Sequence, residues 1–526
     1  MKKAKDNILV RSLFGLVIIS LCLAGAHITA FAQVNAKGSV SIGYIGFDGE
    51  GNRSGAFELF DTYDGFAINN IRVNGNFNER TRYFLDLTDV NFDGRKASLD
   101  ITNFDYFSLK ANYRQTRRIF DSNASSSEDS KFYSGRFQVN PLKGIAGYLE
   151  YRGNKYEGDR VVYGISDQGL FGDSYDSRTG YIKSGVKLNR NGNYLDISYA
   201  TRKYDDRLNN SLDSKARILG ANLFVNALPQ LKALVDFQNI RSKKDLSGDE
   251  IKENRFGLSF LTKPWEKLLL TPKAVYRKVS GVPNDPDFLS YFGGIGGEYR
   301  LPHRSNISAS IGYEIREADT NRTTAIAYSF GLKGRPFKRF GGKLKFDSHN
   351  RRDTYDVLLT GYENRIGFIA EADLYLKKET TVKVGFKSRI RENKDIDTKS
   401  ESSGFYLKLG SKCRKIVKAF IVLSAEDVKY TSPGEVLDYK LKTASGNVML
   451  TPGEKIILSL GGAVLDFNGD IETAKLDLTT SISYRFCEQI GLNISYRRYE
   501  LDGLNLSPTY YEANIINVGA TFYFEK

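Results

Sequence analysis

The sequence predicts an all-β protein, a large antiparallel transmembrane β-barrel of about 26 strands, within a range of 22 to 28. Three observations predict it. Apolar and polar residues alternate along most of the chain, short turns and longer loops follow each other in order, and the last predicted strand is amphipathic with aromatic residues at its end. The composition agrees, because 32 Tyr, 33 Phe and 49 Gly favour strands and tight turns over helices.

The alternation has a period of two residues, which puts one kind of side chain on each face of a strand. Apolar residues occupy alternate positions of the segments 305–316, 368–376, 382–390 and 490–497. Such a strand lies between an apolar and an aqueous environment. The apolar environment is either the core of a β-sandwich or the lipid around a barrel.

Turn spacing favours the barrel over a β-sandwich or a soluble repeat protein. Ten short turns, often with Pro and basic residues, recur about every 38 residues between 142 and 488. Longer acidic loops lie between them, at 121–129, 158–176, 205–213, 245–250, 393–401 and 466–470. Short turns on one rim and longer loops on the other are typical of transmembrane barrels, and an even strand number closes the sheet.

The strand count has three parts. Four strands are predicted near 38–47, 66–77, 81–90 and 95–102, twenty from 106 to about 486, and a final pair near 489–501 and 511–524. In the last strand Phe522 and Phe524 end an alternating apolar series, which resembles the C-terminal assembly strand of bacterial outer-membrane barrels. The chain departs from that pattern by two residues, Glu and Lys, after the last Phe.

The amino terminus reads as a secretory signal peptide over residues 1–32. A basic start precedes an apolar run, and Ala30 and Ala32 occupy the two positions that signal peptidase reads, so we expect cleavage before Gln33. An uncleaved membrane anchor is disfavoured because the apolar run is shorter than the ~20 residues of a spanning helix. Residues 33–526 then form the barrel, and the predicted location is the outer membrane of a Gram-negative bacterium.

The predicted barrel is wide. Roughly 26 strands spaced ~4.8 Å apart and tilted ~40° give a circumference near 160 Å and a diameter near 50 Å. Side chains cannot fill that width, so we expect water or another protein in the lumen. The first strand starts about ten residues after the cleavage site. That spacing leaves no room for a plug domain and excludes a plugged siderophore-type receptor.

The lumen side is expected to carry charges of both signs. The candidates lie mostly in the C-terminal half and are Lys343, Lys345, Lys383, Lys387, Arg389, Lys408, Glu314, Glu371 and Asp373. Any water-facing wall is charged, and this is the simpler interpretation. The alternative is a basic sector that meets an acidic partner or an anionic solute.

No residue pattern indicates chemistry by this chain, and we expect that it is not an enzyme. Three His, three Cys and no CxxC motif do not fit a haem, zinc or iron–sulfur site, so no cofactor is expected in this chain. Ser348, His349 and Asn350 are adjacent on a strand, so they point to alternate faces and cannot form a catalytic relay.

Cys413 and Cys487 are the cysteines of the predicted mature chain. The predicted register puts them on the same rim but four strands apart, roughly 19 Å. A disulfide needs Cα atoms within about 7 Å, so we predict free thiols. Basic clusters such as 114–118 are expected to meet lipopolysaccharide phosphates or a periplasmic partner, and no nucleic acid.

The stretch 106–115, which reads YFSLKANYRQ and precedes a loop rich in Ser and Asp, resembles the MtrB/PioB-type outer-membrane barrels. The strand number and the lack of a plug domain agree with that family. The chain departs from it by lacking an N-terminal CxxC and by being shorter. The resemblance implies a sheath around a periplasmic multihaem cytochrome, which passes electrons to an extracellular one. Haem would then belong to the partners alone.

Two other functions stay open at this point. One is a porin-like channel for solutes, whose charged walls set its selectivity. Its constriction would come from the loop 158–176, which contains Tyr163, Leu170 and Phe171. The other is a structural or surface-binding barrel.

Overall fold

The computed structural model describes residues 35–51, 64–92, 94–119, 127–161, 171–208, 213–281, 287–318, 321–350, 364–377, 379–393, 397–413, 416–470, 472–503 and 510–525. The predicted signal peptide, with Ala30, Ala32 and Gln33, lies outside the described residues. So do Tyr163 and Leu170 of the predicted constriction loop and the side chain of Phe171.

The described residues form 26 strands and their connections. The first thirteen are β1 (Asn35–Gly51), β2 (Gly65–Asn78), β3 (Thr81–Thr88), β4 (Lys96–Asn103), β5 (Phe107–Ile119), β6 (Ser127–Leu142), β7 (Ile145–Val161), β8 (Phe171–Arg190), β9 (Asn193–Asp206), β10 (Ser214–Leu228), β11 (Leu231–Lys244), β12 (Glu250–Trp265) and β13 (Leu268–Ser280). The second thirteen are β14 (Phe288–Leu301), β15 (Ser305–Ala318), β16 (Asn321–Phe337), β17 (Phe340–Asn350), β18 (Asn364–Lys377), β19 (Thr380–Asn393), β20 (Thr398–Cys413), β21 (Val417–Ser432), β22 (Glu435–Leu450), β23 (Ile456–Gly469), β24 (Thr473–Arg485), β25 (Ile490–Gly503) and β26 (Tyr511–Glu525).

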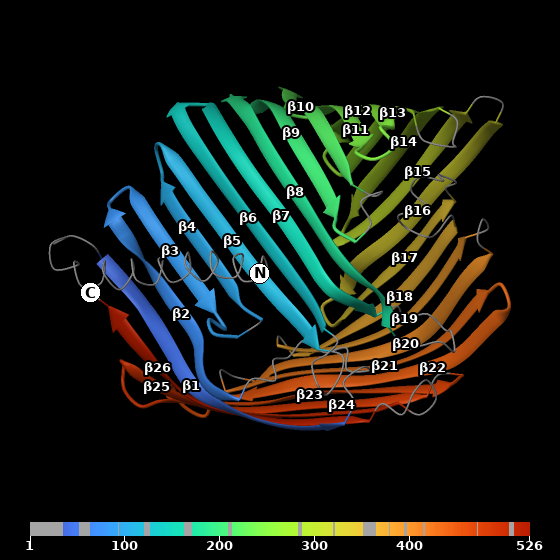
Figure 1. Cartoon of the computed structure of the whole chain (residues 1–526). Coiled ribbons are helices and arrows are strands. Elements are labelled where there is room, and N and C mark those ends of the chain that lie inside the picture. The colour runs from blue at the N-terminus through green and yellow to red at the C-terminus, as the bar shows by residue number, and fades with distance from the viewer. Residues whose placement is uncertain are drawn as a thin grey trace.

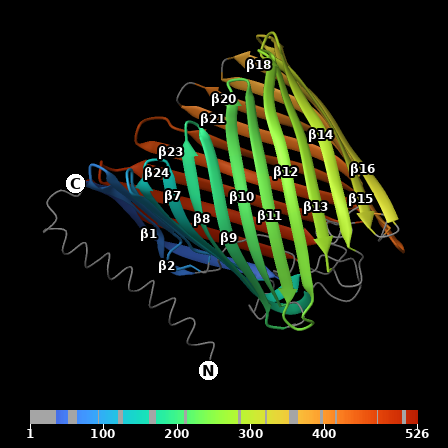
Figure 2. The ribbon, with the colours of Figure 1, turned by 90° about the horizontal axis from the view of Figure 1, so that it is seen from above.

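The strands form one closed antiparallel sheet (Figures 1 and 2). Each strand pairs with the next along the chain, and β26 pairs with β1 over fifteen residue pairs from Lys37–Glu525 to Gly51–Tyr511. The predicted all-β barrel of 26 strands is therefore confirmed. Its division into four early strands, twenty middle strands and a final pair is confirmed as well.

The two rims differ as the turn spacing predicts. The strand ends that flank the ten predicted short turns all lie on one rim, together with both described ends of the chain. On that rim Asn191 and Gly192 both have positive φ, of 50° and 78°, which suits the tight two-residue turn between β8 and β9. Because short turns face the periplasm in such barrels, the opposite rim is the extracellular one.

The predicted loops on the extracellular rim are longer than the observed ones. Both ends of the loop predicted at 158–176 belong to strands, because β7 continues to Val161 and β8 begins at Phe171. Ladder hydrogen bonds continue beyond the apolar band, where polar residues occupy both faces. The apolar alternation that marks a strand in the sequence stops earlier than the strand itself.

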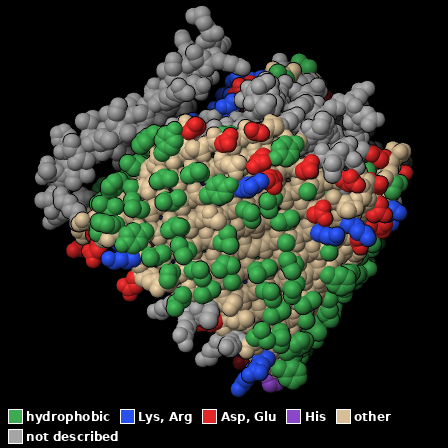
Figure 3. Space-filling view, turned by 90° about the horizontal axis from the view of Figure 1, so that it is seen from below, with side chains coloured by type: hydrophobic (Ala, Val, Ile, Leu, Met, Phe, Trp, Pro, Cys, Tyr) green, Lys and Arg blue, Asp and Glu red, His purple; other side chains and the backbone are tan. Residues whose placement is uncertain are grey.

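The outer face of the sheet is apolar (Figure 3). Aromatic side chains pack against each other on it, with ring centroids 5.6 Å apart for Tyr276 and Tyr291 and 4.9 Å apart for Phe386 and Phe405. Trp265 near the periplasmic rim is 68% exposed. Aromatic residues at both ends of an apolar band are expected where a barrel meets the membrane surfaces. Among the described residues, no helix is long and apolar enough to cross a membrane.

Two glycines face each other at the seam where the barrel closes. Gly43 of β1 is the register partner of Gly519 of β26. A Cβ atom on Gly519 would lie 2.8 Å from the backbone oxygen of Ile42, and one on Gly43 would lie 2.6 Å from that of Val518. The obstacles are backbone atoms, so any side chain here would push the two strands apart.

We therefore predict that Gly519→Val lowers the free energy of unfolding by about 1–3 kcal/mol, the usual cost of overpacking. Gly293→Val is the matched control, because a Cβ atom on that strand glycine meets no atom within 4 Å. Urea unfolding, followed by the heat-dependent gel mobility of the folded barrel, measures both variants. Equal midpoints would show that the seam tolerates a side chain.

Candidate functional site: the inner wall of the barrel

The register puts the predicted lumen-facing residues on the face opposite to the apolar outer wall. Eight of the nine lie on the four adjacent strands β17 to β20. They are Lys343 and Lys345 of β17, Glu371 and Asp373 of β18, Lys383, Lys387 and Arg389 of β19, and Lys408 of β20. Glu314 of β15 lies on the same face but apart from this group, with β16 between.

Ion pairs and a hydrogen bond between side chains of different strands connect this group. The Lys383 ammonium lies 3.2 Å from a Glu371 carboxylate oxygen and 3.3 Å from one of Asp373. The Tyr406 hydroxyl donates a hydrogen bond to Glu371, and Lys387 pairs with Glu426 of β21. These carboxylates are 13–20% exposed, which makes their pairs stronger than those of a fully exposed surface.

Sequence reasoning missed Tyr406 and Glu426. Both occupy alternate positions on the same face as Lys408 and the other predicted residues. The alternation of β20 and β21 could have identified them. Tyr406 lies between the outward-facing Phe405 and Leu407, and Glu426 lies between the outward-facing Ala425 and Asp427. Their partners could not be identified without the register between strands.

The sector keeps a surplus of positive charge. Within the described residues, Lys343 and Lys408 form no ion pair with a carboxylate, and the Lys408 ammonium instead lies 4.8 Å from the centre of the Tyr406 ring. Lys383 and Lys408 are register partners, so two cations face each other across the strands. Such a surface attracts an anionic partner or solute.

Other parts of the inner wall repeat the same arrangement. Arg497 makes two hydrogen bonds to Asp477, of 3.0 and 2.7 Å, and Arg277 lies 2.9 Å from Glu253. Glu314 accepts a hydrogen bond of 2.5 Å from Ser290. Acidic and basic side chains thus pair with each other at several places along the inner wall.

One part of the inner face is apolar, which the sequence analysis did not foresee. Tyr499, Leu501, Tyr511 and Ala513 of β25 and β26 are at most 2% exposed, and Phe47 of β1 packs against them. These residues lie toward the extracellular rim, next to the seam. The inner wall is therefore polar along most of the barrel and apolar at this place.

The register places the adjacent residues Ser348 and His349 on opposite faces of β17. Ser348 and His349 are register partners of Tyr328 and Ala327, residues on opposite faces of β16. Within the part of the chain that the structure describes, no group of three or more His, Cys, Asp and Glu could hold a metal ion.

The two predicted thiols lie near the ends of different strands. Cys487 is a free thiol and follows β24, while Cys413 ends β20, and three strands separate β20 from β24. The side chain of Cys413 lies outside the described residues.

Comparison with known proteins finds likeness in structure but not in sequence. No family model and no curated protein matches the chain. The FrpB iron transporter from Neisseria meningitidis (F5-1 variant) matches with a TM-score of 0.52 and 10% identity, over 93% of this chain and 82% of that one. A ferric enterobactin receptor mutant from Pseudomonas aeruginosa (PfeA) matches with a TM-score of 0.53 and 8% identity, over 94% and 80%.

This chain is an outer-membrane β-barrel. The closed sheet, the apolar outer face and the likeness to bacterial receptor barrels agree on this location. At these identities the likeness shows the fold alone. It does not identify a cytochrome-sheathing family.

We predict that Glu371→Gln lowers the free energy of unfolding by about 1–3 kcal/mol, because Lys383 and Tyr406 lose a shared, largely buried carboxylate. Asp347→Asn is the matched control on the same face. Its pair with Lys345, 2.9 Å long, is 47% exposed on both sides, so its loss should cost less than about 1 kcal/mol. Urea unfolding in detergent measures both, and equal effects would contradict a distinct role for Glu371.

Proposed function

We propose that the barrel is a wide passage through the outer membrane whose lumen houses a folded periplasmic partner, a multihaem cytochrome that passes electrons across the membrane. The observation that carries the proposal is the closed wall of 26 strands. With a diameter of ~50 Å, and side chains that reach ~7 Å inward from each side, ~35 Å stays open. A folded domain of about 100 residues has a similar diameter.

The width itself favours an occupied lumen. A water-filled passage of ~35 Å would let large solutes cross the outer membrane. A folded partner removes that leak and makes use of the polar inner wall. The barrel then separates the partner from lipid and fixes its position, while the redox chemistry belongs to the cofactors of the partner.

The charge of the wall supports an acidic partner. In the sector on β17 to β20, Lys343 lies opposite Glu371 in the register but forms no ion pair with a described carboxylate, and neither does Lys408. The pairs of Lys383 and Lys387 lie next to them. An acidic protein surface, or the carboxylates of haem propionates, would complement these cations. The resemblance of the stretch 106–115, most of which forms β5, to the MtrB/PioB-type barrels supports a cytochrome in particular.

A porin-like channel is the second candidate. The ion pairs on the inner wall favour it, because rings of paired charges can select solutes without a bound protein. The two functions predict different results on purification. A sheath should be extracted from the membrane together with a haem-containing partner, and a channel should be extracted without one.

The test is purification of the barrel from native outer membranes in mild detergent, followed by absorbance. We expect a Soret band at several haems per barrel in a stable complex, and this chain cannot supply covalent haem because it has no CxxCH. The double variant Lys343→Gln, Lys408→Gln should retain less cytochrome. The matched control Lys232→Gln, Lys273→Gln replaces inner-face lysines of β11 and β13 and should retain it. A colourless barrel that conducts ions in a planar bilayer would refute the sheath and support the channel.

A further inference from the structure

The outer wall carries a basic patch at the extracellular end of β9 to β13. Its members are the exposed cations Lys203, Lys215, Arg217, Arg241, Lys243, Lys252 and Lys278. They share the outer face with apolar residues closer to the membrane centre. Leu219, for example, is 45% exposed and lies two residues from Arg217 on β10.

Like charges face each other across the strands of this patch. Arg217 is the register partner of Arg241, Lys215 of Lys243, and Arg241 of Lys252. Like charges in directly opposite positions destabilise a sheet. Lys203, Lys215 and Lys252 have carboxylate partners, at 2.6 Å from Asp205, 2.9 Å from Asp245 and 3.7 Å from Glu250. Among the described residues, Arg217, Arg241, Lys243 and Lys278 form no ion pair with a carboxylate.

The corresponding region on β21 to β23 is built differently. There Lys429 faces Asp438, Lys440 faces Asp427, and Lys442 faces Asp466. These lysines are also exposed on the outer face beyond the apolar band. The opposed cations on β9 to β13 are therefore not a general property of the extracellular end. They indicate an anion that the described chain does not provide.

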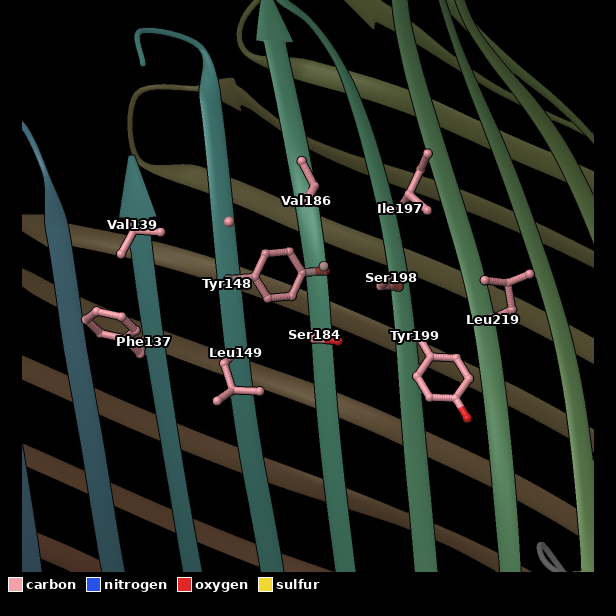
Figure 4. Close-up of a pocket in the computed structure, with 12 residues that line it drawn as sticks. Phe137, Val139, Tyr148, Leu149, Ser184, Val186, Ile197, Ser198, Tyr199 and Leu219 are labelled. Atoms are coloured by element: carbon pink, nitrogen blue, oxygen red, sulfur yellow. The ribbon is translucent and has the colours of Figure 1, made fainter. Parts of the chain in front are cut away.

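An apolar depression lies on the outer face of β6 to β10 (Figure 4). It lies on the membrane side of the patch and adjoins it at Leu219, two residues from Arg217. It has a volume of about 670 Å³ and its rim is formed by large side chains, among them Leu149, Val186, Ile197 and Leu219. Gly147 and Ser184 are the small residues on the outer face at its base, because Gly147 faces Val186 and Leu149 faces Ser184 in the register. Tyr148 closes the wall behind it: its ring lies against Gly185 on the inner face, and its hydroxyl donates to Asp196.

We propose that this surface binds lipopolysaccharide, the phosphorylated glycolipid of the outer leaflet, with its phosphates on Arg217, Arg241 and Lys243 and an acyl chain in the depression. The patch lies on the extracellular side, where the headgroups of that leaflet lie. Arginine binds phosphate oxygens through two parallel hydrogen bonds. Arg217 and Arg241 are register partners, so they place two guanidinium groups side by side on adjacent strands. The phosphates relieve the repulsion between the opposed cations. The apolar depression favours a lipid over free phosphate as the ligand, because an acyl chain can fill it.

The test is native mass spectrometry of the purified barrel, with heat-dependent gel mobility as the check on folding. The variant Arg217→Gln, Arg241→Gln, Lys243→Gln should retain roughly ten-fold less lipopolysaccharide per barrel, since the charge-assisted contacts to phosphate are lost. The control Lys429→Gln, Lys440→Gln, Lys442→Gln removes the same number of charges and should retain it fully. Equal retention by the two triple variants would overturn the site.

Two further experiments test which chemical groups of the ligand are bound. Ser184→Leu fills the depression and leaves every charge in place, so it should also lower retention; unchanged retention would overturn the acyl-chain contact. Excess phosphatidylglycerol should not displace the bound lipopolysaccharide. Displacement would show a surface for any anionic lipid and would contradict the specific site.

Discussion

Closure of the backbone hydrogen-bond ladder is the constraint on which the rest of the structure depends. In lipid, an unpaired backbone amide or carbonyl has no water to bond with, so a sheet can cross the membrane only if it has no edge. The fifteen pairs between β1 and β26 remove the two edges that a 26-stranded sheet would otherwise have. The seam therefore joins the two ends of the chain, and Gly43 and Gly519 let the strands approach there.

Closure at this strand number has two consequences. The first is that the lumen is too wide for side chains to fill. The second is that each strand has lipid on one face and a polar interior on the other. On β19 this means that Phe386 packs with Phe405 on the outer face, while Lys383 and Lys387 pair with carboxylates on the inner one. The same alternation that makes the wall stable in lipid provides the charged surface proposed to face a partner.

The sequence was sufficient for the features that depend on local pattern. The alternation of 305–316 predicted β15, and Asn191 with Gly192 marked a tight turn, since both residues accept positive φ. Features that depend on register were not predictable in this way. Glu426 and Lys387 are 39 residues apart in sequence. Arg217 and Arg241 face each other only in the register that β10 and β11 adopt after the shift between Asn226 and Leu228. The ends of the strands were also missed, because polar residues beyond the lipid continue the ladder without an apolar signal.

The most direct test of the account is the width of the lumen, measured by polymer exclusion in a planar bilayer on the isolated barrel. We predict that neutral polymers with diameters up to about 35 Å enter the pore and lower its conductance, while larger ones leave it unchanged. A cutoff near 10 Å, or no conductance, would contradict a wide lumen. It would also remove the basis for a folded partner inside it.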